Sequence, residues 1–326
     1  RDSSELVEEA SEAMEKSGLE EIGLLSLSTT DYSNIMDIMK EIHAVAKKRH
    51  VSMSIPSIRP EAYDDSLFEI IASERKGGLT LAPEAGTPRL RAVINKKIST
   101  DDLNLSVDRA IGMGWKRIKL YFMMGLPTET DDDLMGIVSI CEDIALKLRR
   151  VGGTLRISIS PFVPKPHTPF QWEPQISMDE IRRKGEFLFR ELRSRHVHCD
   201  LDRRNPFTSF LEGLFSRGDR KIAELLINAW HKGAVCDGWD DLRSKEAWEQ
   251  AIEELDFDCD RYRLSRDEDA FLPWDIVDPG YPKEYLLREY KKAYKEKHTP
   301  NCRDIRCEKC SNCDFERMVI NDSPNK

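Results

Sequence analysis

The chain has 326 residues, 40% of them hydrophobic and 33% charged, with a formal net charge of −9. This length allows one large α/β domain with a smaller appendage, and the negative charge argues against a surface that binds nucleic acid indiscriminately. The mean hydropathy is −0.54, no apolar run approaches the roughly 20 residues that span a bilayer, and no basic-then-apolar leader opens the sequence. We therefore expect a soluble, cytoplasmic protein without a membrane partner.

The first half of the chain alternates short apolar segments with amphipathic segments of helical period. The apolar segments predict strands at 22–27, 51–55, 79–82, 117–124 and 155–162. The amphipathic segments predict helices at 5–16, 35–48, 67–73, 88–94, 102–113 and 131–150. This rhythm is typical of βα units on a parallel sheet. A Rossmann fold shares it, but no GxGxxG follows the first predicted strand, so a dinucleotide-binding fold is disfavoured and a barrel or partial barrel remains.

The second half of the chain opens with five prolines between residues 161 and 174, which break any regular element. Ser177 and Glu180 have the spacing of a capping box, which predicts the start of a long helix. Residues 207–255 are predicted to be mainly helical, and a polar tail follows them.

The eight cysteines fall into two groups. Four are isolated, and each is predicted to be a small buried hydrophobic residue: Cys141, Cys199, Cys236 and Cys259. The other four crowd into twelve residues near the end of the chain: Cys302, Cys307, Cys310 and Cys313. Without a secretory leader, their spacing predicts a metal site rather than disulfides. Four thiolates fit either Zn²⁺ or an iron–sulfur cluster, and the spacing leaves both metals open.

Polar turns follow four of the predicted strands, at residues 28–32, 83–87, 124–130 and 160–166. In parallel α/β sheets the ligand binds at the carboxyl ends of the strands. The first three turns carry hydroxyls or a carboxylate beside turn-forming residues, which suits a polar ligand such as a nucleoside. Ordinary βα turns and helix N-caps explain the same composition, so no single turn decides between the two readings.

Taken together, these segments resemble the radical S-adenosylmethionine (SAM) superfamily. The resemblance is carried, in chain order, by LSLSTTDYS, IPSIRP, LAPEAGTPRLR, YFMMGLPTETDDD and SPFVPKPHTPFQW. Within the superfamily the sequence is most similar to a group often found with a cobalamin-binding-like domain and related to methylthiotransferases. The resemblance implies a partial (βα) TIM-like barrel at 1–175 that lacks its first strand, a mainly helical region at 176–296 and a four-cysteine metal-binding tail at 297–326.

The resemblance also implies which residues contact the methionine and ribose portions of SAM. Glu84 stands where the superfamily contacts the ribose or the amino group, and a carboxylate accepts hydrogen bonds from either. Arg91 or Lys96 would meet the SAM carboxylate. The loop that receives the methionine amino group corresponds to Ser28, Thr29 and Thr30.

The adenine of SAM has its own implied contacts. The segment that packs against the base corresponds to Met124, Gly125, Leu126 and Pro127, where glycine lets the backbone approach closely. Phe162, after the last predicted strand, would line the adenine side.

The superfamily binds a catalytic [4Fe–4S] cluster through a CxxxCxxC loop, and the 326 residues contain no such motif. In similar proteins this loop lies shortly before a segment like Ser3–Val7, so we expect a chain truncated just after it, and inactive alone. The complete enzyme is implied to cleave SAM reductively to a 5′-deoxyadenosyl radical. Its implied partners are an electron donor such as flavodoxin or ferredoxin and an unidentified substrate, RNA or protein. The resemblance also favours an auxiliary iron–sulfur cluster over Zn²⁺ at the C-terminal cysteines.

Two alternative functions stay open at the level of sequence. A catalytically empty barrel with a zinc knuckle would be an RNA- or protein-binding module, and eight basic residues between 182 and 204 would suit it. We interpret that basic stretch mainly as a solvated helix face. A metal-free aldolase-type barrel would need a Schiff-base lysine or paired carboxylates at the strand ends, and the last predicted strand offers only Lys165 in its loop.

Overall fold

The computed structural model describes residues 2–24, 32, 34–54, 78–239 and 241–300. Its strands form two parallel sheets within those ranges. The first sheet pairs β1 (Glu21–Gly23) with β2 (Ser52–Ser54). The second has the order β3 (Leu79–Glu84), β4 (Arg117–Met124), β5 (Thr154–Pro161) and β6 (Cys199–Arg203). The predicted α/β class with parallel strands is therefore confirmed.

The N-terminal unit is built from two helices packed on the short sheet. Helix α1 (Ser3–Ser17) is capped by Asp2, and α2 (Ile35–Arg49) ends in a left-handed residue, His50. Their facing apolar stripes bury side chains in one cluster: Ala10, Met14, Ile38, Met39 and Ile42. Of the predicted strand at 22–27 only the first half lies among the described residues, and the predicted helix at 67–73 lies outside them.

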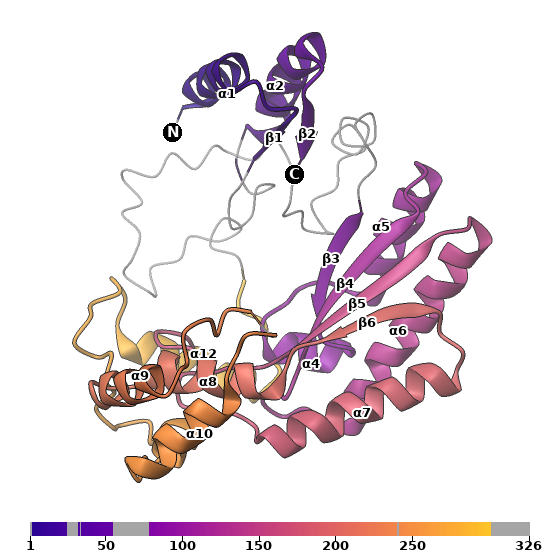
Figure 1. Cartoon of the computed structure of the whole chain (residues 1–326). Coiled ribbons are helices and arrows are strands. Elements are labelled where there is room, and N and C mark those ends of the chain that lie inside the picture. The colour runs from indigo at the N-terminus through magenta and orange to yellow at the C-terminus, as the bar shows by residue number, and fades with distance from the viewer. Residues whose placement is uncertain (1, 25–31, 33, 55–77, 240, 301–326) are drawn as a thin grey trace.

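The larger sheet has helices on one side. Helices α4 (Pro88–Val93) and α5 (Thr100–Gly112) connect β3 to β4, α6 (Asp131–Arg150) connects β4 to β5, and α7 (Met178–Ser194) connects β5 to β6. Figure 1 shows α5, α6 and α7 lying along one side of the sheet. Parallel strands need such crossover connections.

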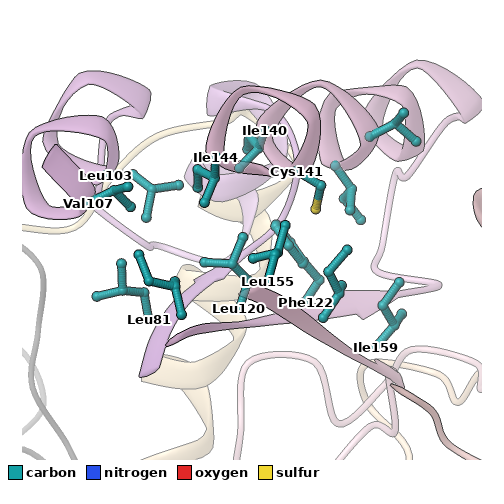
Figure 2. Close-up of a cluster of buried hydrophobic side chains, with 14 of the residues drawn as sticks. Leu81, Leu103, Val107, Leu120, Phe122, Ile140, Cys141, Ile144, Leu155 and Ile159 are labelled. Carbon is teal, nitrogen blue, oxygen red and sulfur yellow. The ribbon is translucent and has the colours of Figure 1, made fainter. Parts of the chain in front are cut away.

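The main core lies between this sheet and its helices. Every second residue of β4 is buried, so one row of side chains faces the helices while the other row is accessible. Figure 2 shows side chains of α5 and α6 above those of the strands: Leu103, Val107, Ile140, Cys141 and Ile144 over Leu81, Leu120, Phe122, Leu155 and Ile159. Cys141 is fully buried, as predicted, and burial raises the pKa of its thiol. Cys199, Cys236 and Cys259 are only half-buried, so that prediction was wrong for them.

The other face of the larger sheet is polar. Lys119, Arg156 and Asp200 lie side by side in one register row across β4, β5 and β6, and Tyr121 continues the accessible row of β4. A parallel strand that is covered on both faces has a continuous run of apolar residues. In the larger sheet, apolar and polar residues alternate along the strands, so one face of the sheet is apolar and the other is polar. The described strands form two separate ladders and no closed barrel.

The region around α7 differs from the sequence prediction in three details. Strand β6 was not predicted, because it contains the charged residues Asp200 and Asp202 at alternate positions and lies in a polar stretch of the sequence. Ser177 caps α7 by accepting a hydrogen bond from the Glu180 backbone, but the Glu180 carboxylate pairs with Arg183 rather than closing a capping box. The basic stretch is not uniformly solvated either, since Lys184 is buried.

The rest of the chain is mainly helical, as predicted. It contains α8 (Pro206–Arg217), α9 (Lys221–His231), α10 (Lys245–Glu254), α11 (Asp260–Arg263) and α12 (Lys283–Ala293). In Figure 1 these helices gather below and to the left of the larger sheet. Helices α8 to α11 enclose their own apolar cluster, with Phe207, Leu214, Leu225, Trp248 and Tyr262. Nowhere in the ranges that the structure describes is a helix both long and apolar enough to cross a membrane.

Candidate functional site

The carboxyl ends of β3, β4 and β5 lie next to one another. Glu84 is in register with Phe122, Met124 is in register with Pro161, and the Phe162 amide donates to the Met124 carbonyl at 2.8 Å. The fold therefore brings three of the predicted contacts to one edge: Glu84, the 124–127 segment and Phe162. The predicted loop of Ser28, Thr29 and Thr30 lies outside the described residues.

Glu84 ends β3 in an unusual backbone conformation. The β3–β4 register shifts between Leu81 and Glu84, and Glu84 has φ +67°. A non-glycine residue in this region is strained and occurs preferentially at functional sites. Burial raises the pKa of the Glu84 carboxyl, and the Lys96 ammonium, 3.6 Å from its Oε1 atom, opposes this effect. Both side chains keep about a quarter of their surface exposed, 27% and 28%.

The two cations predicted to meet the SAM carboxylate behave differently. Arg91 is 1% exposed, and its guanidinium donates to the Ile98 carbonyl at 2.8 Å and to Thr100 Oγ1 at 2.7 Å. Burial lowers its pKa. Arg91 thus ties α4 to the start of α5, while Lys96 is the cation that reaches the strand end.

Gly125 makes the turn after β4. It has φ +79°, and a Cβ atom there would overlap Cδ1 of Ile176 and lie 2.9 Å from its Cγ1. Glycine is therefore needed both for the backbone conformation and for the close approach. The Gly125 amide donates to Glu129 Oε1 at 2.8 Å, and the Glu129 amide donates to the Leu126 carbonyl at 3.1 Å. These bonds hold the turn in one conformation.

The apolar side chains of this edge divide into buried and accessible ones. Met124, Leu126 and Pro127 are buried, so this segment presents backbone rather than side chains. Met123, which points the other way from Met124, and Phe162 are half-buried and pack in one cluster with Phe170. The Phe162 and Phe170 rings meet edge-to-face at 5.8 Å. Sequence reasoning missed Met123, although strand alternation signals that the two methionines face opposite sides.

A buried ion pair supports the Gly125 turn from below. Lys184 Nζ of α7 lies 2.8 Å from Glu129 Oε1, and the two side chains are 7% and 2% exposed. Glu129 Oε2 is buried and has no hydrogen-bond partner among the described residues. Burial raises the pKa of the Glu129 carboxyl, and the hydrogen bond from Lys184 opposes this. The pair was not predicted, because Glu129 lies in a predicted turn and Lys184 lies in the basic stretch that we interpreted as a solvated helix face.

The loop between β3 and α4 rests directly on the start of α6. A Cβ atom on Gly86 would overlap the backbone of Asp133 and Ile137, so only glycine fits there. Asp133 accepts hydrogen bonds from Thr87, Arg89 and the Thr130 amide. Burial raises the pKa of Asp133, but these hydrogen bonds outweigh it and hold the pKa below the ordinary value. The Glu84 strand end is thereby fixed to the next βα unit.

The end of the described chain lies against the same edge. Helix α12 packs on α4, Arg89 donates to Glu296 Oε1 at 3.3 Å, and the Thr299 amide donates to Asn95 Oδ1 at 2.9 Å. The predicted metal ligands, Cys302, Cys307, Cys310 and Cys313, lie outside the described residues. Within those residues no group of three or more His, Cys, Asp or Glu side chains is placed to hold a metal ion.

Lys165, the candidate of the aldolase alternative, is engaged elsewhere. Its ammonium lies 2.6 Å from Glu212 Oε1 and 3.0 Å from Ser216 Oγ, both on α8. A Schiff-base lysine needs a neutral amine in an apolar or cationic setting. The Lys165 side chain is instead held by a carboxylate and a hydroxyl of α8, which argues against that alternative.

Comparison with known proteins shows which family this chain is similar to. Residues 1–141 match the model of the Radical SAM superfamily, which confirms the resemblance at the level of the superfamily. An uncharacterised protein of Methanocaldococcus jannaschii is 29% identical over 217 residues, 67% of this chain and 46% of that protein. The chain thus spans about half the length of this curated relative.

Solved structures of SuiB from Streptococcus suis are also similar to this chain. SuiB bound to S-adenosylmethionine has 12% identity and a TM-score of 0.44, over 63% of this chain and 45% of SuiB. SuiB without a named ligand has 13% identity and a TM-score of 0.44, over 70% of this chain and 50% of SuiB.

Proposed function

We propose that this chain, whose residues 1–141 match the Radical SAM superfamily, is part of a radical SAM enzyme that binds SAM at the carboxyl edge of β3, β4 and β5. The observation that carries the proposal is the position of Glu84. Its carboxylate stands at a strand end in a strained backbone conformation, beside the Gly125 turn and Phe162. Glu84 supplies a hydrogen-bond acceptor, the Gly125 turn supplies backbone, and Phe162 supplies apolar surface. A nucleoside that carries a charged substituent, such as SAM, requires groups of these three kinds.

In this proposal Glu84 and Lys96 receive the polar part of the ligand. The Glu84 carboxylate accepts hydrogen bonds from the ribose hydroxyls or the methionine ammonium of SAM. Lys96, 3.6 Å from Glu84, opposes the effect of burial on the pKa of that carboxyl and is placed to meet the SAM carboxylate when it binds. Ser28, Thr29 and Thr30 remain the proposed loop for the methionine amino group. Arg91 is not part of this proposal, because its donors are already satisfied.

The adenine contacts follow from the same geometry. The 124–127 segment brings its backbone to this edge, and the half-buried Met123 and Phe162 offer apolar side-chain surface beside it. We propose that the base lies against these groups. Glu129 acts as a positioning residue, since it accepts the hydrogen bond from the Gly125 amide.

SAM and a reduced [4Fe–4S] cluster together supply the superfamily's chemistry, reductive cleavage of the sulfonium to methionine and a 5′-deoxyadenosyl radical. The described residues do not fit such a cluster, since they hold no group of three metal ligands. What this chain's own residues do is bind SAM, orient it and exclude water around it.

SAM binding to the full chain tests the proposal. We expect Glu84→Gln to weaken the affinity for SAM, measured by equilibrium dialysis with labelled SAM. The matched control is Glu142→Gln, which removes another half-buried, ion-paired carboxylate, 2.9 Å from Arg195 and on α6. Equal affinity in both variants and the unmodified chain would contradict the assignment of Glu84.

The coding sequence upstream of Arg1 tests the class of chemistry. An in-frame CxxxCxxC motif there supports radical SAM cleavage, and the longer protein should then form 5′-deoxyadenosine with a reductant. A start codon without such cysteines would favour the alternative, a binding module without catalysis.

A metal at the C-terminal cysteines is a separate part of the proposal. We expect metal analysis to find Zn²⁺ or an iron–sulfur cluster, and visible absorption with sulfide analysis to distinguish them. Replacing Cys307 and Cys310 by Ser should remove the metal, because two of four thiolate ligands are lost.

A further inference from the structure

A cavity of about 490 Å³ lies in the C-terminal helical region, outside the site described above. Its wall comes from the end of α8, the turn before α9, helix α11 and the segment that follows α11. Three of its lining residues are arginines, Arg220, Arg261 and Arg266, and one is a carboxylate, Asp219. In a chain with a net charge of −9, such a concentration of positive charge is unexpected.

The single carboxylate of the cavity is already engaged. Asp219 Oδ1 accepts hydrogen bonds from the Lys221 amide and the Tyr262 hydroxyl, both at 2.9 Å. Its Oδ2 atom lies 3.5 Å from Arg261 Nη2. Asp219 therefore compensates at most one of the three guanidinium groups, and the lining keeps an excess of two positive charges.

A fourth arginine lies behind the cavity wall. Arg217 is 0% exposed, and its Nη1 and Nη2 atoms donate to the carbonyls of Arg263 and Leu264, both at 3.2 Å. Arg266 Nη2 in turn donates to the Arg217 carbonyl at 3.0 Å. The Nε atoms of Arg217 and Arg266 are buried without a hydrogen-bond partner in the described part of the chain.

The charges of this cluster disfavour one another. Burial lowers the pKa of Arg217 to about 10, and the neighbouring Arg266 adds to this, while Glu173 opposes it. Burial also lowers the pKa of Arg266, with a further contribution from Arg261. A buried cation is stable when a carboxylate is paired with it. Glu173 stabilises the charge of Arg217 and Asp219 stabilises that of Arg266, so four arginines face two carboxylates. A bound anion would supply the missing negative charge.

Apolar side chains form the rim of the same cavity. Phe271 and Ile276 are 75% and 78% exposed, although both are large hydrophobic residues, and Pro273 lies between them in the lining. Arg266 is held over the face of Trp274, with its Cζ atom 5.2 Å from the ring centroid. The cavity thus combines a fixed cationic wall with an accessible aromatic ring.

We propose that this cavity binds the phosphate of a nucleotide on Arg220, Arg261 and Arg266, with the base against Phe271. Two uncompensated charges match a phosphate dianion better than a single carboxylate, and guanidinium groups bind phosphate in a bidentate manner. An exposed aromatic ring beside such a site stacks on a base. The phosphate comes from a free mononucleotide or from the 5′ end of an RNA. The proposal is independent of the SAM site.

Calorimetric titration of the full chain tests it, with SAM present in excess so that the site at the strand ends is filled. The probes are AMP, adenosine, inorganic phosphate and a 5′-phosphorylated RNA tetranucleotide. We expect AMP to bind more tightly than adenosine or phosphate. Arg261→Ala should weaken AMP binding about tenfold or more, through the lost charge-assisted contact. Phe271→Ala should weaken it about tenfold, and leave phosphate binding unchanged.

The matched control is Arg182→Ala, which removes an exposed arginine that is ion-paired with Asp179 on α7. It should bind AMP like the unmodified chain. Tighter binding of the tetranucleotide than of AMP identifies an RNA end as the ligand, and equal binding identifies a mononucleotide. No AMP binding at millimolar concentration, or equal AMP affinity in Arg261→Ala, Phe271→Ala and Arg182→Ala, overturns the proposal. Thermal unfolding of each variant shows that its fold is retained.

Discussion

Two buried cations in this protein are stabilised in opposite ways. Lys184 is 6% exposed and lies 2.8 Å from a buried carboxylate, Glu129. Arg217 is 0% exposed and donates only to backbone carbonyls, with other arginines beside it. The first arrangement is complete without a ligand and holds the Gly125 turn in place. In the second, no ion pair holds the guanidinium within the described residues, although Glu173 opposes the lowering of its pKa, and Arg217 lies behind the wall of the proposed phosphate site. The two cations therefore differ in what their removal leaves behind: a buried carboxylate in the first case and two backbone carbonyls in the second.

The largest expected effect is on the complete pair. Lys184→Met leaves Glu129 buried without a counter-charge, and breaking such a pair should cost about 3–5 kcal/mol of unfolding free energy. Urea unfolding measures it. The double variant Glu129→Leu with Lys184→Met removes both charges and should recover much of the loss. The control Arg182→Ala, two residues earlier on the same helix, should change stability by less than about 0.5 kcal/mol. Equal stability of Lys184→Met and the control would contradict the scaffold role.

The turn that this pair supports gives the next effect. Gly125→Ala should cost about 2–4 kcal/mol, because alanine is disfavoured at φ +79° and its Cβ would overlap Ile176. Gly152→Ala is the matched control, since Gly152 has φ +65° but nothing within 4 Å of the added Cβ. It should cost only the backbone term, about 1–2 kcal/mol. Chemical denaturation separates the two, and equal losses would show that Ile176 moves aside without cost.

We expect the protein to lose less stability when Arg217 is replaced than when Lys184 is replaced. Arg217→Met removes two hydrogen bonds to carbonyls and also removes an uncompensated buried charge, so we expect a loss of no more than about 2 kcal/mol. Comparing its unfolding free energy with that of Lys184→Met tests the contrast directly. A loss for Arg217→Met as large as that for Lys184→Met would mean that Arg217 is a structural residue, and the contrast between the two cations would fail.

The periodicity of apolar residues was enough to predict most of the strands and helices of the larger sheet. The ranges predicted for β4 and α6 agree with the structure, because both alternate or repeat their apolar residues at a clear period. The three strand ends that form the candidate site followed from the same pattern and the rule for parallel sheets. Strand β6 was missed because an edge strand with alternating carboxylates has no apolar run to detect.

What the sequence did not reveal depends on contacts between distant elements. The Glu129–Lys184 pair joins residues 55 positions apart, and neither residue type signals burial. Arg91 and Lys96 are equivalent as cations in a sequence, and only the fold shows that one faces the interior and the other Glu84. The arginine cavity joins the end of α8 to residues more than forty positions later. Such pairings follow from tertiary packing, which periodicity does not encode.

The smallest expected effect concerns the pH dependence of SAM binding. Burial raises the pKa of Glu84 above its ordinary value of 4.5, so the carboxylate takes up a proton at a higher pH than a free glutamate does. SAM affinity should therefore fall by about tenfold, or 1.4 kcal/mol, as the pH is lowered through that raised pKa, because the acceptor charge is lost. Glu84→Gln cannot titrate at this position and should bind weakly at every pH. Equilibrium dialysis between pH 7 and about pH 4, within the range where the fold is intact, measures both profiles. A profile that is equally steep in the variant would assign the pH dependence to another group and remove Glu84 from the site.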